Sequence, residues 1–334
     1  MSTFFKVLSV LAVFCCASAY SEEKSAYGPE LEGFSYPWPV HQFKFESQQN
    51  TLHMAYMDVA PSSQANGLTV VLLHGKNFCG ATWESSARVL SKAGYRVVIP
   101  DQIGFCKSSK PKAYQYTFQQ LAENTKQLLE SLGIHKAIIM GHSTGGMLAI
   151  RYGLMYPKAT AQLVLVDPIG LEDWKRKGVP YLGVDRWYQH ELKKTDTGIR
   201  NYERKTYYAG QWKPEYEKWV QMLAGMYRGP GKDIVAWNSA LLYNMIYTQS
   251  VYYELQDITE PTLLMVGAKD TTAIGKAFAA PADRAKLGNY PVLAKAAAKR
   301  IPHASLVIFP DAGHAPQMQE PDKFHQILLS KLLK

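Results

Sequence analysis

Residues 136–156 read KAIIMGHSTGGMLAIRYGLMY. The apolar run at Lys136–Met140 is typical of a strand that is buried on both faces of a parallel sheet. A helical pattern covers Thr144–Tyr156, and the string GHSTG, with Ser143 at its centre, joins the two. Placed between a buried strand and a helix, this G-x-S-x-G string predicts a sharp turn that raises the serine hydroxyl above the end of the sheet.

Strand-like runs and helical patterns alternate along most of the chain. Further strands are predicted at Leu68–Leu73, Arg96–Pro100, Ala161–Val166, Pro261–Val266 and Ser305–Phe309, with a hairpin around Gln49-Asn50 between Phe43 and Val59. Further helices are predicted at Ala81–Ala93, Thr117–Leu132 and Asp322–Leu333. This alternation is typical of a doubly wound α/β sheet with right-handed crossovers.

The alternation stops in residues 168–256. This segment has no strong strand run, and 16 Tyr and Trp residues fall in the 80 residues from Trp174 to Tyr253, or 20% against 12% aromatic residues overall. We interpret it as a helical cap whose aromatic side chains line its inner face and also pack its own core. The remaining parts are an irregular leader at 20–42, a core domain at 43–167 and 257–334, and a second insertion at Thr271–Ala304 with a helix at Pro291–Arg300.

The first 19 residues have the layout of a secretory signal peptide. Lys6 is their only charge, an apolar run from Val7 to Cys16 follows, and Ala17-Ser18-Ala19 provides a small-residue cleavage site before Tyr20. The apolar run is too short to be a permanent membrane anchor. We therefore expect a secreted or periplasmic protein.

A serine hydroxyl becomes an effective nucleophile only when a base accepts its proton. His314 is the predicted base, because it follows the strand at Ser305–Phe309 directly, after the small residues of Ala312-Gly313. An acid must then hold the imidazole in place. Asp270, which follows the strand at Pro261–Val266, is preferred for this role, and Asp167, which ends the preceding strand, is the alternative.

Two backbone N–H groups are expected to bind the oxyanion that forms during attack. One belongs to Thr144, the residue after the nucleophile. The other is expected in the loop after His74-Gly75, with Lys76 preferred and Asn77 or Phe78 as alternatives. Two cysteines, Cys79 and Cys106, fall in loops at this same end of the sheet. An exported protein permits a disulfide between them, and two free thiols are the alternative.

Taken in order, these motifs resemble those of the cap-bearing serine hydrolases of the α/β-hydrolase superfamily. The matching pieces span residues 68–320 and are Leu73-His74-Gly75 with Trp83, Asp101-Gln-Ile-Gly104-Phe-Cys-Lys-Ser108, the serine turn, Asp270 and His314. The resemblance implies an eight-stranded, mostly parallel sheet flanked by helices, a lid after the sixth strand, and hydrolysis without a cofactor. The sequence departs from the family pattern at Cys106, where glycine is common, and in the long insertion after Asp270.

Serine at the turn points to acyl transfer, since haloalkane dehalogenases and epoxide hydrolases of this fold carry aspartate there. We expect a serine hydrolase acting on an ester or lactone of a medium-sized, partly apolar or aromatic molecule. A C–C-bond or amide hydrolase, or a non-catalytic ligand-binding protein on this scaffold, are the alternatives.

The 334 residues are 47% hydrophobic and 19% charged, with a net charge of 37 − 28 = +9, which fits a globular protein. Dispersed Lys and Arg predict no nucleic-acid partner, and no metal-binding motif is present in the sequence. The oligomeric state stays open.

Overall fold

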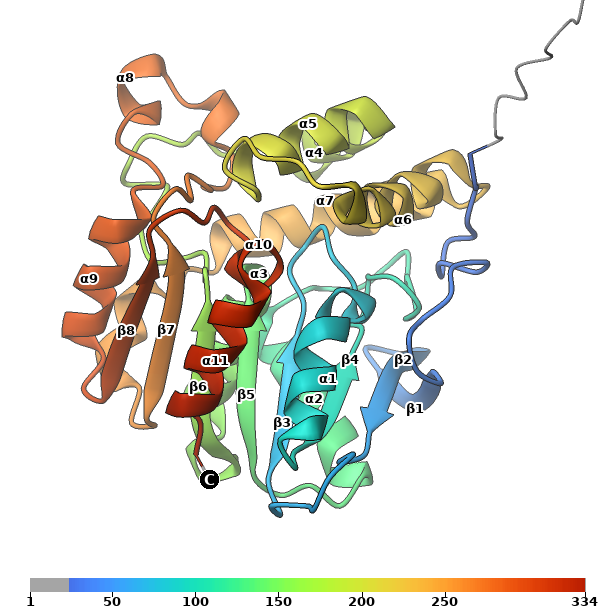
Figure 1. Cartoon of the computed structure of the whole chain (residues 1–334). Coiled ribbons are helices and arrows are strands. Elements are labelled where there is room, and N and C mark those ends of the chain that lie inside the picture. The colour runs from blue at the N-terminus through green and yellow to red at the C-terminus, as the bar shows by residue number, and fades with distance from the viewer. Residues whose placement is uncertain (1–23, 334) are drawn as a thin grey trace, which may run out of the picture.

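The computed structural model describes residues 24–333, and an eight-stranded sheet forms the centre of the molecule (Figure 1). Its strand order is β1-β2-β4-β3-β5-β6-β7-β8. The strands are β1 (His41–Ser47), β2 (Asn50–Val59), β3 (Thr69–Leu73), β4 (Arg96–Pro100), β5 (Ala137–His142), β6 (Thr160–Val166), β7 (Thr262–Gly267) and β8 (Ala304–Phe309). β2 is antiparallel to β1 and to β4, and the other neighbours are parallel. The predicted mostly parallel, eight-stranded sheet is therefore confirmed.

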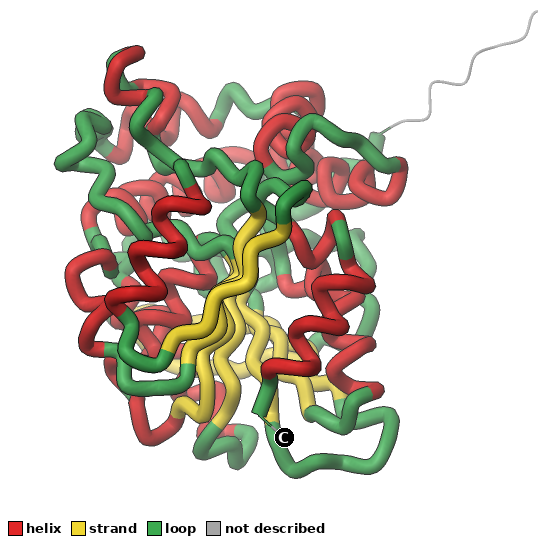
Figure 2. The backbone as a smooth tube through the Cα atoms, turned by 60° about the vertical axis from the view of Figure 1, so that its left-hand side comes forward, coloured by secondary structure: helices red, strands yellow, loops and turns green. Residues whose placement is uncertain are grey.

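Helices cover both faces of this sheet, which is why its central strands are mostly apolar (Figure 2). All residues of β5 and β7 are buried, whereas the edge strand β1 is half exposed. On one face, α1 (Glu84–Lys92) and α11 (Pro321–Lys331) pack on the sheet through Leu90 and Phe324. On the other face, α2 (Phe118–Ser131), α3 (Thr144–Met155) and α9 (Tyr290–Arg300) contribute Leu128, Leu148 and Leu293 to the core.

A helical segment between β6 and β7 lies over the end of the sheet where β5, β7 and β8 finish (Figure 1). It contains α4 (Val184–Glu191), α5 (Asp196–Thr206), α6 (Glu217–Arg228) and α7 (Lys232–Thr248), and we call it the α4–α7 insertion. The segment after β7 adds α8 (Pro281–Arg284), and α10 (Pro316–Gln319) follows β8. Short 3₁₀ turns complete the chain at Gly80–Trp83, Pro157–Ala159, Pro214–Tyr216, Tyr252–Asp257 and Lys276–Phe278.

The aromatic residues of the α4–α7 insertion mostly pack against one another. Tyr208 stacks on Tyr216 with ring centroids 3.7 Å apart, and Trp187 stacks on Tyr243 at 4.2 Å. Tyr207 instead faces the sheet, with its ring 5.0 Å from that of His314. Aromatic contacts are therefore found within the insertion and between the insertion and His314.

The first hairpin differs slightly from its prediction. Ser47 pairs with Asn50, so the two turn residues are Gln48 and Gln49, which have φ values of 50° and 60°. A two-residue hairpin of this kind needs positive φ at both positions, and Asn-Gly is its usual sequence. The Gln-Gln pair lacks this usual turn sequence. The observed turn therefore lies one residue before the predicted Gln49-Asn50.

The N-terminal leader packs along the α4–α7 insertion from residue 24 onward. The amide of Tyr27 donates to the carbonyl of Gly225 (2.9 Å), and the guanidinium of Arg228 donates to the carbonyl of Ser25. The predicted signal peptide at 1–19 lies outside the described residues. Within residues 24–333, no helix is both long and apolar enough to cross a bilayer.

Candidate active site

Ser143 sits on the strained turn between β5 and α3. Its backbone adopts φ 57° and ψ −118°, and its side chain is buried, with 5% of the residue exposed. Two glycines make the turn possible. A Cβ on Gly141 would lie 2.0 Å from the carbonyl oxygen of Gly145, and a Cβ on Gly145 would lie 2.2 Å from that of Leu73. No side chain can occupy either position without moving the backbone.

The structure brings Ser143, His314 and Asp270 together in one chain of hydrogen bonds. Nε2 of His314 lies 2.8 Å from Oγ of Ser143, and Nδ1 of His314 lies 2.6 Å from Oδ2 of Asp270. Since the carboxylate of Asp270 accepts, Nδ1 carries the hydrogen, and Nε2 is left to accept from the serine hydroxyl. The amide of Thr272 donates to the other oxygen of Asp270 (2.8 Å) and fixes its orientation.

Asp167, the alternative acid, lies behind this chain and not against the imidazole nitrogen. It ends β6 with a φ of 38°, is fully buried, and accepts a hydrogen bond from the amide of Gly267 (2.9 Å). One oxygen each of Asp167 and Asp270 and one nitrogen of His314 fall within 4.8 Å of one another. Burial raises the pKa of the Asp167 carboxyl well above its usual range, and the charge of Asp270 adds to this effect. Asp167 is therefore the neutral member of the pair.

The loop at residues 75–80 runs beside the nucleophile. A Cβ on Gly75 would lie 3.1 Å from Cβ of Ser143. The amide of Phe78 donates to the carbonyl of Gly75 (3.1 Å), so this amide is occupied by the turn itself. Within residues 24–333, no protein acceptor takes the amide hydrogens of Lys76, Asn77 or Thr144. Of the three alternatives that the sequence left in this loop, Lys76 and Asn77 keep an available donor.

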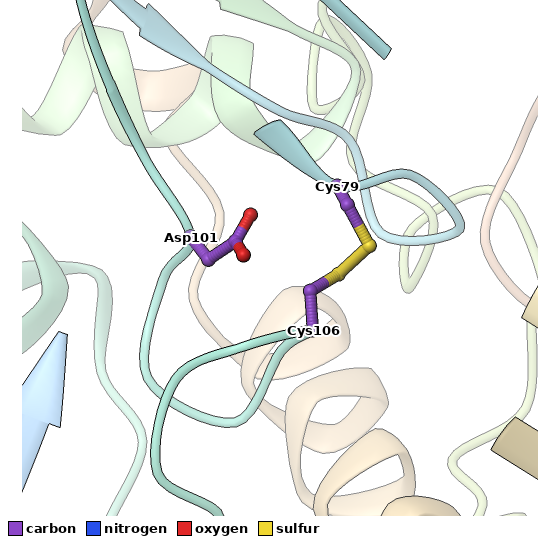
Figure 3. Close-up of side chains that lie close together, drawn as sticks. All are labelled: Cys79, Asp101 and Cys106. Carbon is purple, nitrogen blue, oxygen red and sulfur yellow. A yellow bond between two sulfur atoms is a disulfide. The ribbon is translucent and has the colours of Figure 1, made fainter. Parts of the chain in front are cut away.

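Cys79 and Cys106 form a disulfide, with Cα atoms 5.8 Å apart, which is one of the two alternatives left open by the sequence (Figure 3). Beside it, the carboxylate of Asp101 accepts from the amide of Gly80 (2.7 Å), the hydroxyl of Tyr36 (2.6 Å) and the amide of Lys107 (3.1 Å). The far end of the 75–80 loop is thus fastened to the core domain twice, once covalently and once through Asp101.

Two histidines next to the nucleophile form hydrogen bonds with backbone groups of the neighbouring loops. His74 donates from Nδ1 to the carbonyl of Gly75 (2.9 Å) and accepts from the amide of Gln102 (3.1 Å). His142 donates from Nε2 to the carbonyl of His314 (2.6 Å). Burial lowers the pKa of both imidazoles, and for His142 the nearby His314 lowers it further. Both are therefore neutral supports of the loops that meet here.

Two clusters of the described residues have side chains of the types that bind metals. In both clusters these side chains are already bonded to other groups of the protein. Asp270 and His314 are bound to each other and are fully buried beside Asp167. Cys79 and Cys106 are bonded as a disulfide, and the neighbouring Asp101 already accepts three hydrogen bonds. The chemistry that this geometry supports is nucleophilic attack by Ser143, with His314 as the proton acceptor.

Comparison with known proteins agrees with this geometry. A sequence model described as the alpha/beta hydrolase fold matches residues 69–321. The chain belongs to the α/β-hydrolase fold family. The crystal structure of a "probable hydrolytic enzyme" from Pseudomonas aeruginosa PAO1 superposes with a TM-score of 0.92 at 59% identity and covers 93% of this chain and 99% of that chain. The protein is a hydrolase of this family.

Other relatives of this α/β hydrolase are more distant. Lipase 1 of Psychrobacter immobilis is 27% identical over 80% of this chain and 77% of its own length. A 2-hydroxy-6-oxononadienedioate/2-hydroxy-6-oxononatrienedioate hydrolase of Comamonas testosteroni is 34% identical, but the match spans only 35% of this chain and 42% of that enzyme.

The side chains of Tyr207, Asn77 and Lys76 also lie next to the hydrolase site. The sequence pointed to the backbone amides of Lys76 and Asn77 but not to their side chains, and it did not single out Tyr207. Tyr207 accepts a hydrogen bond at its phenol oxygen from the side-chain amide of Asn77 (2.9 Å). The side chain of Lys76 points into the α4–α7 insertion, where it donates to Oγ of Ser239 (2.6 Å). No motif in the sequence distinguishes Tyr207 from the other aromatic residues of residues 168–256. An open hollow of about 550 Å³ reaches Asp270 from the second insertion but does not reach Ser143.

Gly145→Ala should destabilise the fold strongly, because its methyl group would meet the backbone of Leu73 and His74. We expect the free energy of unfolding in urea to fall by about 2 kcal/mol or more. Gly183→Ala is the control, since a Cβ at Gly183 has no atom within 4 Å, and it should change stability by less than about 1 kcal/mol. Equal effects of the two substitutions would contradict the close approach at Gly145.

Reducing the disulfide should lower stability without unfolding the protein, because Asp101 still holds the same loop. The bond closes a loop of 27 residues, for which chain entropy gives roughly 3–4 kcal/mol. Urea unfolding with and without reductant measures this loss, and a Cys79→Ala/Cys106→Ala variant should not respond to reductant. Intact mass measured with and without reductant should differ by about 2 Da, and an unchanged mass would show two free thiols.

Proposed function

We propose that this α/β hydrolase is a secreted serine hydrolase that cleaves a carboxylic ester, or a lactone, of a medium-sized, partly apolar or aromatic small molecule. The observation that carries the proposal is the hydrogen-bonded chain from Ser143 through His314 to Asp270. This constellation performs acyl transfer on several unrelated folds, and its chemistry is set by geometry and not by sequence position.

In the acylation step, Oγ of Ser143 attacks the ester carbonyl carbon while Nε2 of His314 takes the hydroxyl proton. Asp270 stabilises the imidazolium that forms. The carbonyl oxygen becomes an oxyanion and accepts hydrogen bonds from the amides of Thr144 and Lys76. When the C–O bond breaks, the proton passes from His314 to the leaving alcohol, and the acyl group stays on Ser143.

Deacylation repeats these steps with water as the nucleophile. His314 removes a proton from the water as it attacks the acyl carbon, and the second tetrahedral intermediate collapses to release the acid. The proton returns to Oγ of Ser143, so the enzyme is regenerated. Every proton is moved by this chain's own residues, which is consistent with the expectation that no cofactor is needed.

The α4–α7 insertion fits the role of a cap over the substrate. Tyr207 from the insertion and Phe78 from the core lie edge to face, with ring centroids 5.1 Å apart, beside His314. Aromatic walls near the reacting atoms favour an apolar or aromatic portion of the substrate. The similarity to a lipase supports ester chemistry.

Export is proposed on two grounds. Residues 1–19 have the sequence of a signal peptide. The Cys79–Cys106 disulfide is the kind of bond that persists in oxidising compartments.

Ester hydrolysis that depends on Ser143 is the central prediction. On a panel of esters varied in acyl length and in aromatic alcohol, Ser143→Ala should lower turnover by about 10⁴-fold or more. A fluorophosphonate should label Ser143 in the wild type and should label His314→Ala much more slowly. The wild-type rate should fall in acid, because a protonated imidazole cannot accept the serine proton.

Two results would overturn this proposal. Folded wild-type protein that neither hydrolyses the panel nor reacts with the fluorophosphonate would indicate a ligand-binding protein on this scaffold. Labelling at Ser143 without ester turnover would favour the alternative of a C–C-bond or amide hydrolase, for which the partial match to the dienedioate hydrolase supplies a starting substrate class.

The two buried acids should respond differently to the same substitution. Asp270→Asn removes the charge that faces His314 and should lower kcat by about 10³–10⁴-fold. Asp167→Asn imitates a neutral carboxyl, since its amide can still accept from Gly267 and donate to Asp270, and kcat should stay within about threefold of the wild type. The reverse order of effects would make Asp167 the catalytic acid.

A further inference from the structure

The α4–α7 insertion is bonded to the loop that carries the proposed base. The amide of His314 donates to the carbonyl of Thr206 (3.1 Å), and the amide of Ala315 donates to the carbonyl of Tyr207 (3.2 Å). These are backbone bonds between segments more than 100 residues apart. The insertion therefore fixes where His314 stands as well as covering it.

The insertion is also bonded to the near end of the 75–80 loop. The side-chain amide of Asn77 donates to the phenol oxygen of Tyr207 (2.9 Å). The ring of Tyr207 packs between Phe78 (5.1 Å between centroids) and His314 (5.0 Å). One residue of the insertion thus contacts the loop of the proposed oxyanion donors and the proposed base at once.

Lys76 provides a second connection, through a hydrogen bond and a charge contact. Burial lowers the pKa of Lys76 to about 7, although the charge of Glu191 opposes this shift. The ammonium group of Lys76 donates to Oγ of Ser239 on α7 (2.6 Å), lies 3.6 Å from the ring centroid of Tyr243, and is 3.8 Å from Oε2 of Glu191 on α4. The Lys76 side chain is 9% exposed and that of Glu191 is fully buried. Separating the two members of a buried ion pair costs free energy, because each charge that loses its partner stays out of contact with water.

Glu191 is held as a carboxylate by the groups around it. Lys194 lies 2.8 Å from Oε2, Tyr227 donates to the same oxygen (2.5 Å), and Ser239 donates to it as well. Burial alone would raise the pKa of Glu191, but the charges of Lys194 and Lys76 hold it well below its ordinary value. The insertion therefore offers a preformed anion to which Lys76 is attached.

We propose that Tyr207 and Lys76 are positioning residues, through which closure of the α4–α7 insertion sets the place of the oxyanion donors and of the base. This inference rests on the proposed function. Asp101 and the disulfide fasten the 75–80 loop to the core only at Cys79 and Gly80. The backbone amides of Thr144 and Lys76 are the proposed donors, and the side chains of Lys76 and the adjacent Asn77 are held from the insertion side.

Movement of the insertion would expose the site to substrate, since Ser143 is 5% exposed and His314 is 1% exposed in this structure. When it moves away, the bonds from Asn77 and Lys76 break, and the donors lose the fixed geometry that oxyanion stabilisation requires. A displacement of about 1 Å at such a site can cost about 100-fold in rate. The complete site is therefore assembled only in the closed arrangement.

Tyr207→Phe removes only the phenol oxygen, and it therefore tests the hydrogen bond from Asn77 to Tyr207. The ring and both backbone bonds remain, so folding should be unaffected. We expect kcat for the esters to fall about five- to tenfold, as the loss of one hydrogen bond in the transition state implies, while KM stays within about twofold. Tyr208→Phe is the matched control, since the hydroxyl of the adjacent Tyr208 only contacts Sδ of Met318 at 3.9 Å, and its kcat should be unchanged.

Lys76→Met tests this connection. Lys76→Met/Glu191→Gln also neutralises the buried carboxylate, although Lys194 then loses its charged partner, and it is the second variant if the single variant is unstable. Both should lower kcat by about 10- to 100-fold at similar KM. Both should also speed hydrogen exchange at the amides of the 75–80 loop. Arg200→Met, which breaks the Arg200–Glu217 pair inside the insertion, should change neither measurement.

The inference is overturned if the double variant has wild-type kcat and wild-type exchange in the 75–80 loop, or if Tyr207→Phe and Tyr208→Phe are equally active. If the wild type hydrolyses none of the esters, the proposed function fails. In that case, hydrogen exchange in the 75–80 loop, compared between the wild type and the two Lys76 variants, still tests whether the insertion holds this loop.

Discussion

The site depends on a contact of backbone with backbone. The turn that carries Ser143 crosses the end of β3 so closely that a methyl group on Gly145 would lie 2.2 Å from the carbonyl oxygen of Leu73. This contact places the nucleophile directly beside the loop that leaves β3, whose Gly75 is also pressed against Ser143 and His142. Nucleophile and donor loop are thus neighbours because two glycines, Gly145 and Gly75, let two chain segments touch. The strain at Ser143, with a φ of 57°, is maintained by the packed sheet on which the turn rests.

A second constraint is the burial of two carboxyl groups side by side. Asp167 and Asp270 follow adjacent strands, β6 and β7, and are both buried. Two ionised carboxylates as close as these would repel each other strongly in a dry site. Only Asp270 has the imidazole of His314 to balance a charge during the reaction. Burial and the charge of Asp270 raise the pKa of the Asp167 carboxyl well above its ordinary value. The proton of Asp167 therefore lies on the carboxyl group that does not contact His314.

Much of this could be predicted from the sequence, because the signals are local. The apolar runs that became β5 and β7, the G-x-S-x-G turn, and the positions of Asp270 and His314 just after strands are each visible within a few residues. What escaped prediction depends on contacts between distant segments. The directions of the Lys76 side chain and of Tyr207 are set by residues more than 100 positions away. The choice between a disulfide and free thiols at Cys79 and Cys106 likewise required the two loops to be placed in space.

On the proposed function, these contacts connect substrate recognition with catalysis. An enzyme whose donors belong to the core alone would stabilise the oxyanion whether or not its cap had closed. Here the near end of the donor loop and the backbone of His314 are both bonded to the α4–α7 insertion. An ester that prevents the insertion from closing would therefore meet misplaced donors and would react slowly even if it reached Ser143. Water that enters the open site would find the same incomplete machinery. Selectivity for the acyl and alcohol portions could then arise from closure itself, in the manner of induced fit, without further polar contacts to the substrate.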